Sequence, residues 1–133
     1  MEQQQICDTA EAVLWMADNK RTAAAIQARR AFVNGEIGEA ELAAAKKAAV
    51  DAAVDLAGAA AEDFRHDYPC PPQWRAMHEA GIEAAWAAVA AVDGDADGTT
   101  AYALSALGKA RAAGDVHPDW PAKVAATAKR LSR

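Results

Sequence analysis

Alanine is the feature of this sequence that most restricts its fold. It occupies 39 of the 133 positions and recurs along the whole chain. Alanine is the best helix former and a poor strand former, so this content favours helices and disfavours a sheet. The four tryptophans and a spread of valine, leucine and isoleucine can bury a core, which argues against disorder. We therefore expect an all-α protein.

The length and the hydrophobic pattern predict a single helical domain over residues 1–133. A chain of 133 residues fits one domain and leaves little room for two. The proline-rich segment 68–72 separates two helical halves, but it is too short and rigid to act as a linker. Apolar residues at helical spacing, with breakers between them, predict a compact bundle of about six helices. The expected helices are 8–19, 23–34, 38–66, 72–92, 99–113 and 120–131.

Polar residues predict how several of these helices begin. Asp8 and Glu11 have the spacing of a capping box at the start of the first helix. Thr22 would cap the second helix, and Asp119 would cap the sixth.

The helix expected over 38–66 is the longest and the richest in alanine. Two apolar stripes cover about half of its circumference, which is wider than the stripe of an ordinary surface helix. We therefore expect a long central Ala-rich helix, with neighbours packed closely on two sides. Asp51, Asp55 and Glu62 share the opposite side and would form a narrow acidic strip in water.

Charge argues against a nucleic-acid partner. The formal net charge is −5, and the one basic cluster lies at the end of the chain, where it suits the dipole of a helix C-terminus. A protein that binds nucleic acid usually concentrates positive charge on one face. The cluster consists of Lys123, Lys129, Arg130 and Arg133.

Hydropathy and cysteine content indicate the cellular compartment in which the protein works. No run approaches 18 apolar residues, so we expect no membrane span. The polar first residues lack the basic start of a secretion signal. Cys7 and Cys70 allow at most one internal disulfide. We therefore expect a reduced, cytoplasmic protein without a cofactor.

One acidic loop resembles half of a calcium site. Asp93, Asp95 and Asp97, followed by Gly98, match the first half of an EF-hand loop. The twelfth position, which should carry a bidentate glutamate, is Leu104. The alternative is an acidic interhelical loop in which the last aspartate, Asp97, or Thr99 caps the next helix.

A second set of metal-type ligands surrounds the proline-rich turn. His66, Cys70 and His78 lie close in sequence, and cysteine and histidine are zinc ligands. Cys70 beside a histidine could also act as a thiol nucleophile. Their spacing matches no zinc signature, and no third group that would orient a nucleophile is evident.

Three bulky side chains and one arginine fall at informative positions. Trp15 lies nearly opposite the apolar stripe of its helix, so it either packs against a later helix or anchors an interface. Trp86, at the edge of its stripe, has the same two interpretations. Trp120 is expected to hold the last turn against the core. Arg30 falls on an apolar stripe and should form an internal ion pair, because an unpaired buried charge is costly.

The segment 21–37, followed by Ala40-Glu41-Leu42-Ala43-Ala44-Ala45, resembles a group of Ala-rich helical proteins of bacteria and their phages. Many members of this group are labelled as immunity proteins. The resemblance covers roughly residues 7–60 and implies a small non-enzymatic protein that binds and neutralises a partner. The group usually continues into longer Ala-Ala-x repeats, whereas this chain turns at 68–72, so its second half lies outside the resemblance.

The function expected from the sequence is therefore protein binding without catalysis. The protein would be an immunity protein or a phage inhibitor of a host defence system, such as an anti-CRISPR protein. One alternative is a metal-binding or thiol-dependent small enzyme centred on His66, Cys70 and His78. Another is a homo-oligomeric helical regulatory protein, for instance a homodimer. The expected partner contacts are Trp15, Trp86, Asp51, Asp55 and Glu62.

Overall fold

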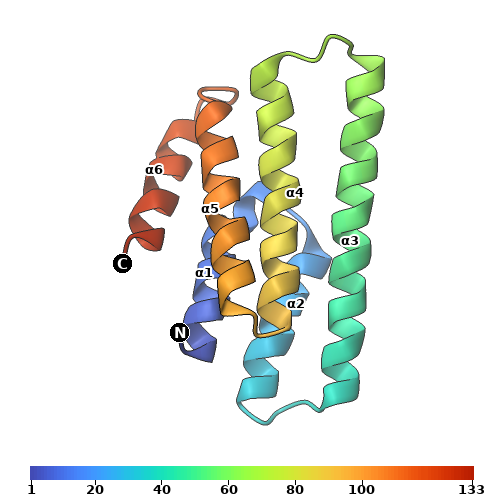
Figure 1. Cartoon of the computed structure of the whole chain (residues 1–133), viewed down its shortest axis with the longest axis vertical. Helices are drawn as coiled ribbons and strands as arrows, with labels where there is room; N and C mark the ends of the chain where they lie inside the picture. The colour runs from blue at the N-terminus through green and yellow to red at the C-terminus, as the bar shows by residue number, and fades with distance from the viewer.

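The computed structural model describes all 133 residues and confirms an all-α bundle of six helices without strands (Figure 1). Five of the expected helices agree with the structure to within three residues at each end, and the first helix begins five residues earlier than expected. None of the helices is long and apolar enough to cross a lipid bilayer. The helices are α1 (Gln3–Ala17), α2 (Lys20–Val33), α3 (Glu39–His66), α4 (Pro72–Val92), α5 (Ala96–Ala112) and α6 (Trp120–Leu131).

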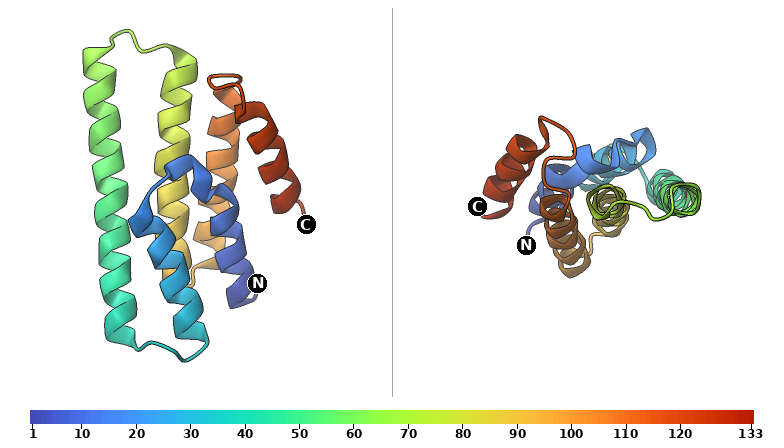
Figure 2. Two further views of the ribbon diagram at one scale, coloured as in Figure 1. Left: turned by 180° about the vertical axis from the view of Figure 1, so that it is seen from behind. Right: turned by 90° about the horizontal axis from the view of Figure 1, so that it is seen from above.

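The helices form two layers with one helix at the side. Helices α3, α4 and α5 lie side by side, α1 and α2 pack behind them, and α6 flanks the bundle (Figure 2). Helix α4 contacts α1, α2, α3 and α5. Helix α3 contacts only α2 and α4, and α6 contacts only α1 and α5. The long central Ala-rich helix is therefore α4, and the prediction that the helix over 38–66 is central is wrong.

Burial explains why α4 takes the central place. Eleven of its 21 residues are buried, and eight of these are alanines, so four neighbouring helices can approach its backbone closely. Helix α3 buries only four alanines among 28 residues. Its other alanines are exposed or partly exposed, because alanine favours the helix whether or not it is buried. The wide apolar stripes of α3 therefore reflect helix propensity rather than packing.

The core consists of two groups of buried residues. The larger group lies mainly among α1, α4 and α5, and includes Ile6, Cys7 and Val13. The smaller group joins α2, α3 and α4 around Ala25, Ala49, Val89 and Val92. Most buried side chains are alanines, so the core is held together by close helix packing more than by large apolar groups.

Two of the expected helix caps are wrong. Helix α1 begins at Gln3, and the side chain of Gln5 accepts a hydrogen bond of 2.9 Å from the backbone N–H of Glu2. Helix α2 begins at Lys20, three residues earlier than expected, because the side chain of Asn19 accepts hydrogen bonds from the backbone N–H groups of Arg21 and Thr22. Thr22 is instead buried inside the helix, where its hydroxyl donates to the Asn19 carbonyl.

Helix α5 begins three residues earlier than expected, and the expected cap of α6 makes no capping hydrogen bond. Helix α5 begins at Ala96, since the carboxylate of Asp95 accepts a hydrogen bond of 2.9 Å from the backbone N–H of Gly98. Asp119 precedes α6 as expected, but its side chain makes no capping hydrogen bond. Its carboxylate lies 3.1 Å from the ammonium group of Lys123 instead.

Candidate functional site

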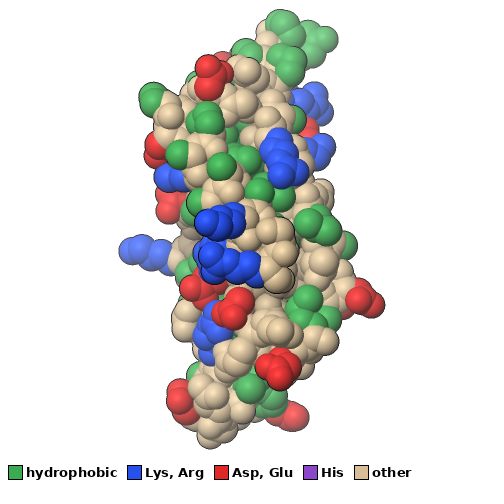
Figure 3. Space-filling view, turned by 90° about the vertical axis from the view of Figure 1, so that its left-hand side faces the viewer, with side chains coloured by type: hydrophobic (Ala, Val, Ile, Leu, Met, Phe, Trp, Pro, Cys, Tyr) green, Lys and Arg blue, Asp and Glu red, His purple; other side chains and the backbone are tan.

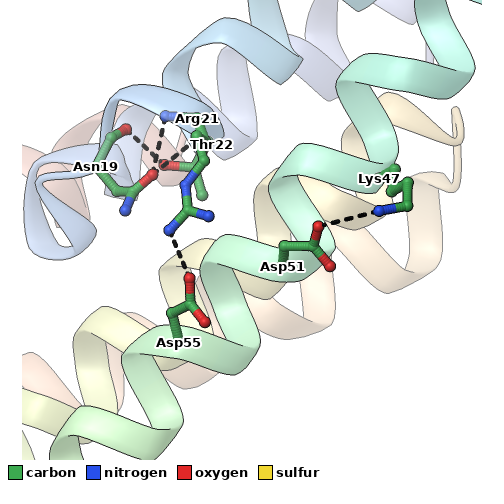
Figure 4. A network of polar contacts seen from close by, with 6 residues as sticks. All are labelled: Asn19, Arg21, Thr22, Lys47, Asp51 and Asp55. Carbon is green, nitrogen blue, oxygen red and sulfur yellow. Dashed lines mark hydrogen bonds and ion pairs between the residues drawn. The ribbon is translucent and has the colours of Figure 1, made fainter.

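The acidic strip on α3 is exposed, and each of its carboxylates pairs with a nearby base. Figure 4 shows the pairs of Asp51 and Asp55. The Asp51 carboxylate lies 3.4 Å from the Lys47 ammonium group. The Asp55 carboxylate lies 2.9 Å from the guanidinium group of Arg21, which comes from α2 beside the Asn19 cap. Glu62 pairs with Arg65 on the same helix. Local bases therefore offset much of the strip's negative charge, and its role in partner binding stays a prediction.

Trp15 is held within the molecule under α6. Its indole N–H donates a hydrogen bond of 2.8 Å to the Thr127 hydroxyl. Its ring lies edge-to-face against Trp120 with the centroids 4.8 Å apart. The Lys123 ammonium group lies 5.5 Å from the centroid of the Trp15 ring. The structure thus places Trp15 against a later helix, and a contact between this side chain and a partner stays a prediction.

Trp120 fastens α6 to the rest of the bundle, as the sequence predicts. It is buried, and its indole N–H donates a hydrogen bond of 2.8 Å to the carbonyl oxygen of Ala110 on α5. The remaining buried residues of α6 are Val124 and Thr127. This short helix is therefore attached by one stripe of side chains.

Trp86 reaches the surface between α4 and α5 and stacks with Tyr102. The two ring centroids are 6.5 Å apart, and the ring planes are inclined by 29°. Trp86 is partly buried and packs against both core groups, whereas Tyr102 is 37% exposed. Sequence reasoning missed Tyr102, because only the pairing of α4 with α5 brings the two rings together.

Arg30 forms the internal ion pair that its place on an apolar stripe predicts. One guanidinium nitrogen lies 2.7 Å from carboxylate oxygens of both Asp8 and Glu11. Another donates a hydrogen bond of 2.6 Å to the side chain of Gln4. Burial disfavours the charged form of Arg30, but the hydrogen bonds to Asp8 and Glu11 outweigh it and raise the pKa. Asp8 and Glu11 therefore join α1 to α2 rather than capping α1.

The acidic loop does not gather its aspartates around a cation. Asp97 belongs to α5, and the carboxylate of Asp95 caps that helix. The Asp93 carboxylate lies 2.7 Å from the Lys46 ammonium group on α3. Nowhere in the chain do three His, Cys, Asp or Glu side chains lie close enough to hold a metal ion.

The residues around the proline-rich turn are also dispersed. His66 lies 3.4 Å from Glu62, and His78 lies 3.8 Å from Asp63. The Cys70 sulfur is close to the carbonyl oxygen of Pro71. The structure therefore does not assemble a zinc site or a cysteine–histidine pair from His66, Cys70 and His78. Cys70 and the buried Cys7 are both free thiols.

A hollow lies between α1, α5 and α6, and sequence reasoning missed it. It has a volume of about 680 Å³. Residues near both ends of the chain contribute to it, and the termini lie near each other on this side of the bundle (Figure 1). We call it the α1–α5–α6 cleft. Its lining residues are Met1, Gln5, Asp8, Thr9, Ala12, Thr100, Ala103, Leu104, Arg130, Leu131 and Arg133.

Comparison with known protein families, characterised proteins and solved structures finds no match to this chain. The resemblance of residues 7–60 to Ala-rich immunity proteins stays an expectation from the sequence.

Proposed function

We propose that this chain is a small, non-enzymatic, cytoplasmic protein that binds and neutralises a partner protein. The observation that carries the proposal is the Trp86–Tyr102 stack at the surface of α4 and α5. Trp86 is held by the core on one side, so its ring is fixed before any partner arrives. Tryptophan and tyrosine are the commonest anchors of protein interfaces, and prior ordering reduces the entropy lost on binding.

The biological role within this class is inferred from the resemblance of residues 7–60 to Ala-rich immunity proteins of bacteria and phages. It favours an immunity protein or a phage inhibitor of a host defence system, such as an anti-CRISPR protein. The bundle would act by covering a functional surface of its partner with a rigid helical face. Among the five contacts expected from the sequence, Trp86 has the strongest support, since Trp15 is engaged by α6 and the acidic strip by nearby bases.

The test is partner capture followed by measurement of affinity. The tagged chain serves as bait in bacterial and phage-infected lysates, and captured proteins are identified by mass spectrometry and purified. We expect Tyr102→Ala and Trp86→Ala each to weaken binding of the true partner by about tenfold or more. The matched control is Val54→Ala, which shortens an exposed apolar side chain on α3.

Two results would count against the proposal. Binding that both aromatic variants leave unchanged would show that the partner uses another surface. A stable self-association that Tyr102→Ala abolishes, seen by light scattering in the absence of any captured partner, would support the homo-oligomeric alternative. Circular dichroism of each variant separates lost binding from lost folding.

A further inference from the structure

The α1–α5–α6 cleft has the size of a small-molecule site. Its volume is about 680 Å³, and sites for small ligands and cofactors usually enclose roughly 300–1,000 Å³. Helix α1 and the consecutive helices α5 and α6 form its walls, so the cleft depends on the position of α6. The Trp15–Thr127 and Trp120–Ala110 hydrogen bonds fix the position of α6 against α1 and α5.

One part of the cleft wall is apolar and uncovered. Ala12 of α1, Ala103 and Leu104 of α5, and Leu131 of α6 line it. Leu104 is 55% exposed. An apolar ligand group that covered these side chains would remove apolar surface from water, which favours binding.

The rim of the cleft is positively charged although the whole chain is acidic. Arg130 and Arg133 line it, and neither has a carboxylate within ion-pair distance. Asp8 is the one acidic lining residue, and Arg30 already pairs with it. Figure 3 shows Lys and Arg side chains interspersed with Asp and Glu side chains on the face of the molecule that carries α6. A guanidinium group binds carboxylates and phosphates through paired hydrogen bonds, so the rim suits an anionic head group.

We propose that the α1–α5–α6 cleft binds a small amphiphile with an anionic head group and an apolar chain. The head group, a carboxylate or a phosphate, lies against Arg130 and Arg133. The apolar chain covers Leu104 and Leu131. The Thr100 side chain lines the same cleft, so its hydroxyl can donate a hydrogen bond to the ligand. This site is separate from the aromatic surface assigned to the partner protein.

Decanoate and decyl phosphate, kept below their micellar concentrations, are the probes of this site. The full chain, labelled with ¹⁵N, is titrated with each probe and followed by amide chemical shifts. We expect saturable shifts at Thr9, Ala12, Thr100 and Ala103 with one or both probes. Acetate and inorganic phosphate, which lack the apolar chain, should produce no saturable shift. Decanol, which lacks the charge, should bind about tenfold more weakly or worse.

Charge-matched variants test the role of the arginines. The double variant Arg130→Gln with Arg133→Gln should weaken binding of the anionic probe about tenfold. The control double variant, Lys129→Gln with Arg111→Gln, removes the same charge from exposed sites outside the cleft and should leave the affinity within about twofold. The amide spectrum of each variant reports whether the bundle is intact.

Three results would overturn the proposal. The first is the absence of saturable shifts with both anionic probes. The second is equal affinity for decanol and the anions, since the arginines would then contribute nothing. The third is an equal loss of affinity in the two double variants, which would show a general effect of charge. If decanoate binds and decyl phosphate does not, or the reverse, the result identifies which head group the rim accepts.

Discussion

At the scale of single residues, the structure is held by polar side chains that join helices far apart in sequence. Arg30 connects α2 to two carboxylates of α1, and the indole of Trp15 connects α1 to Thr127 of α6. No buried polar side-chain atom in the protein lacks a hydrogen-bond partner. The sequence predicts that Arg30 needs a carboxylate, because burying an unpaired charge is costly. It does not identify the carboxylate, since the partner lies on another helix.

The Glu79 carboxylate, between two bases, makes stability depend on pH. A hydrogen bond of 2.6 Å from Lys109 lowers the pKa of Glu79, burial partly opposes this, and Arg75 adds to the lowering. Because the pKa falls below its ordinary value of 4.5 on folding, the ion pair stabilises the protein above about pH 4.5 and is lost as the pH falls through the lowered value. We expect Glu79→Gln to reduce the free energy of unfolding at pH 7 by about 0.5–1 kcal/mol, and by less at pH 3.

Urea unfolding at the two pH values measures this effect. Glu83→Gln, on the same helix, removes a carboxylate that acts on Lys109 only through space, so it should change the stability less than Glu79→Gln does. An equal loss at pH 7 and pH 3 in the Glu79 variant would show that the carboxylate contributes through packing rather than through its charge.

At the scale of helices, the pattern predicts where helices lie far better than how they pack. The expected ranges 38–66, 72–92 and 120–131 nearly coincide with α3, α4 and α6. Apolar periodicity and the proline-rich turn are local signals, and they are sufficient to predict where these helices begin and end. The central position of α4 depends on which faces meet, and alanine gives little information on this point because it is common on both buried and exposed faces.

Gly81 tests the close contact between α1 and α4. A Cβ atom at this position would lie 2.9 Å from the carbonyl oxygen of Met16, a backbone atom that cannot move aside alone. We expect Gly81→Ala to lower the free energy of unfolding by about 1–3 kcal/mol, since the separation of two packed helices outweighs the gain in helix propensity. Urea unfolding followed by circular dichroism measures the change.

Gly108 on α5 is the matched control for that substitution. A Cβ atom there would meet nothing within 4 Å. Gly108→Ala should therefore raise the free energy of unfolding by about 0.5–1 kcal/mol through helix propensity alone. If both glycine substitutions stabilise the protein, α1 and α4 do not approach each other closely at Gly81.

At the scale of the whole molecule, Cys7 reports on opening of the bundle. Its thiol is 0% exposed within the larger core group, and burial raises its pKa, which disfavours the reactive thiolate. In a Cys70→Ser chain, we expect a thiol reagent to label Cys7 at least about a thousandfold more slowly under native conditions than in urea, because labelling requires the bundle to open. The absorbance of the chromophore that each thiol displaces from the reagent gives the labelling rates in native buffer and in urea.

The other cysteine provides the comparison for this experiment. In a Cys7→Ala chain, Cys70 lies in the partly exposed turn before α4 and should react quickly in native buffer. Native labelling of Cys7 at the rate of Cys70 would mean that the core opens readily.

The sequence by itself determined that the chain is helical, roughly where its helices lie, and that Arg30 and Trp120 pack internally. These properties follow from propensity, apolar periodicity and the cost of unpaired charge, all of which act locally. Only the tertiary structure decided that α4 is central, that Trp15 lies under α6 and that Tyr102 stacks on Trp86. It also decided that the α1–α5–α6 cleft exists, because helices from both ends of the chain must first pack together to form its walls.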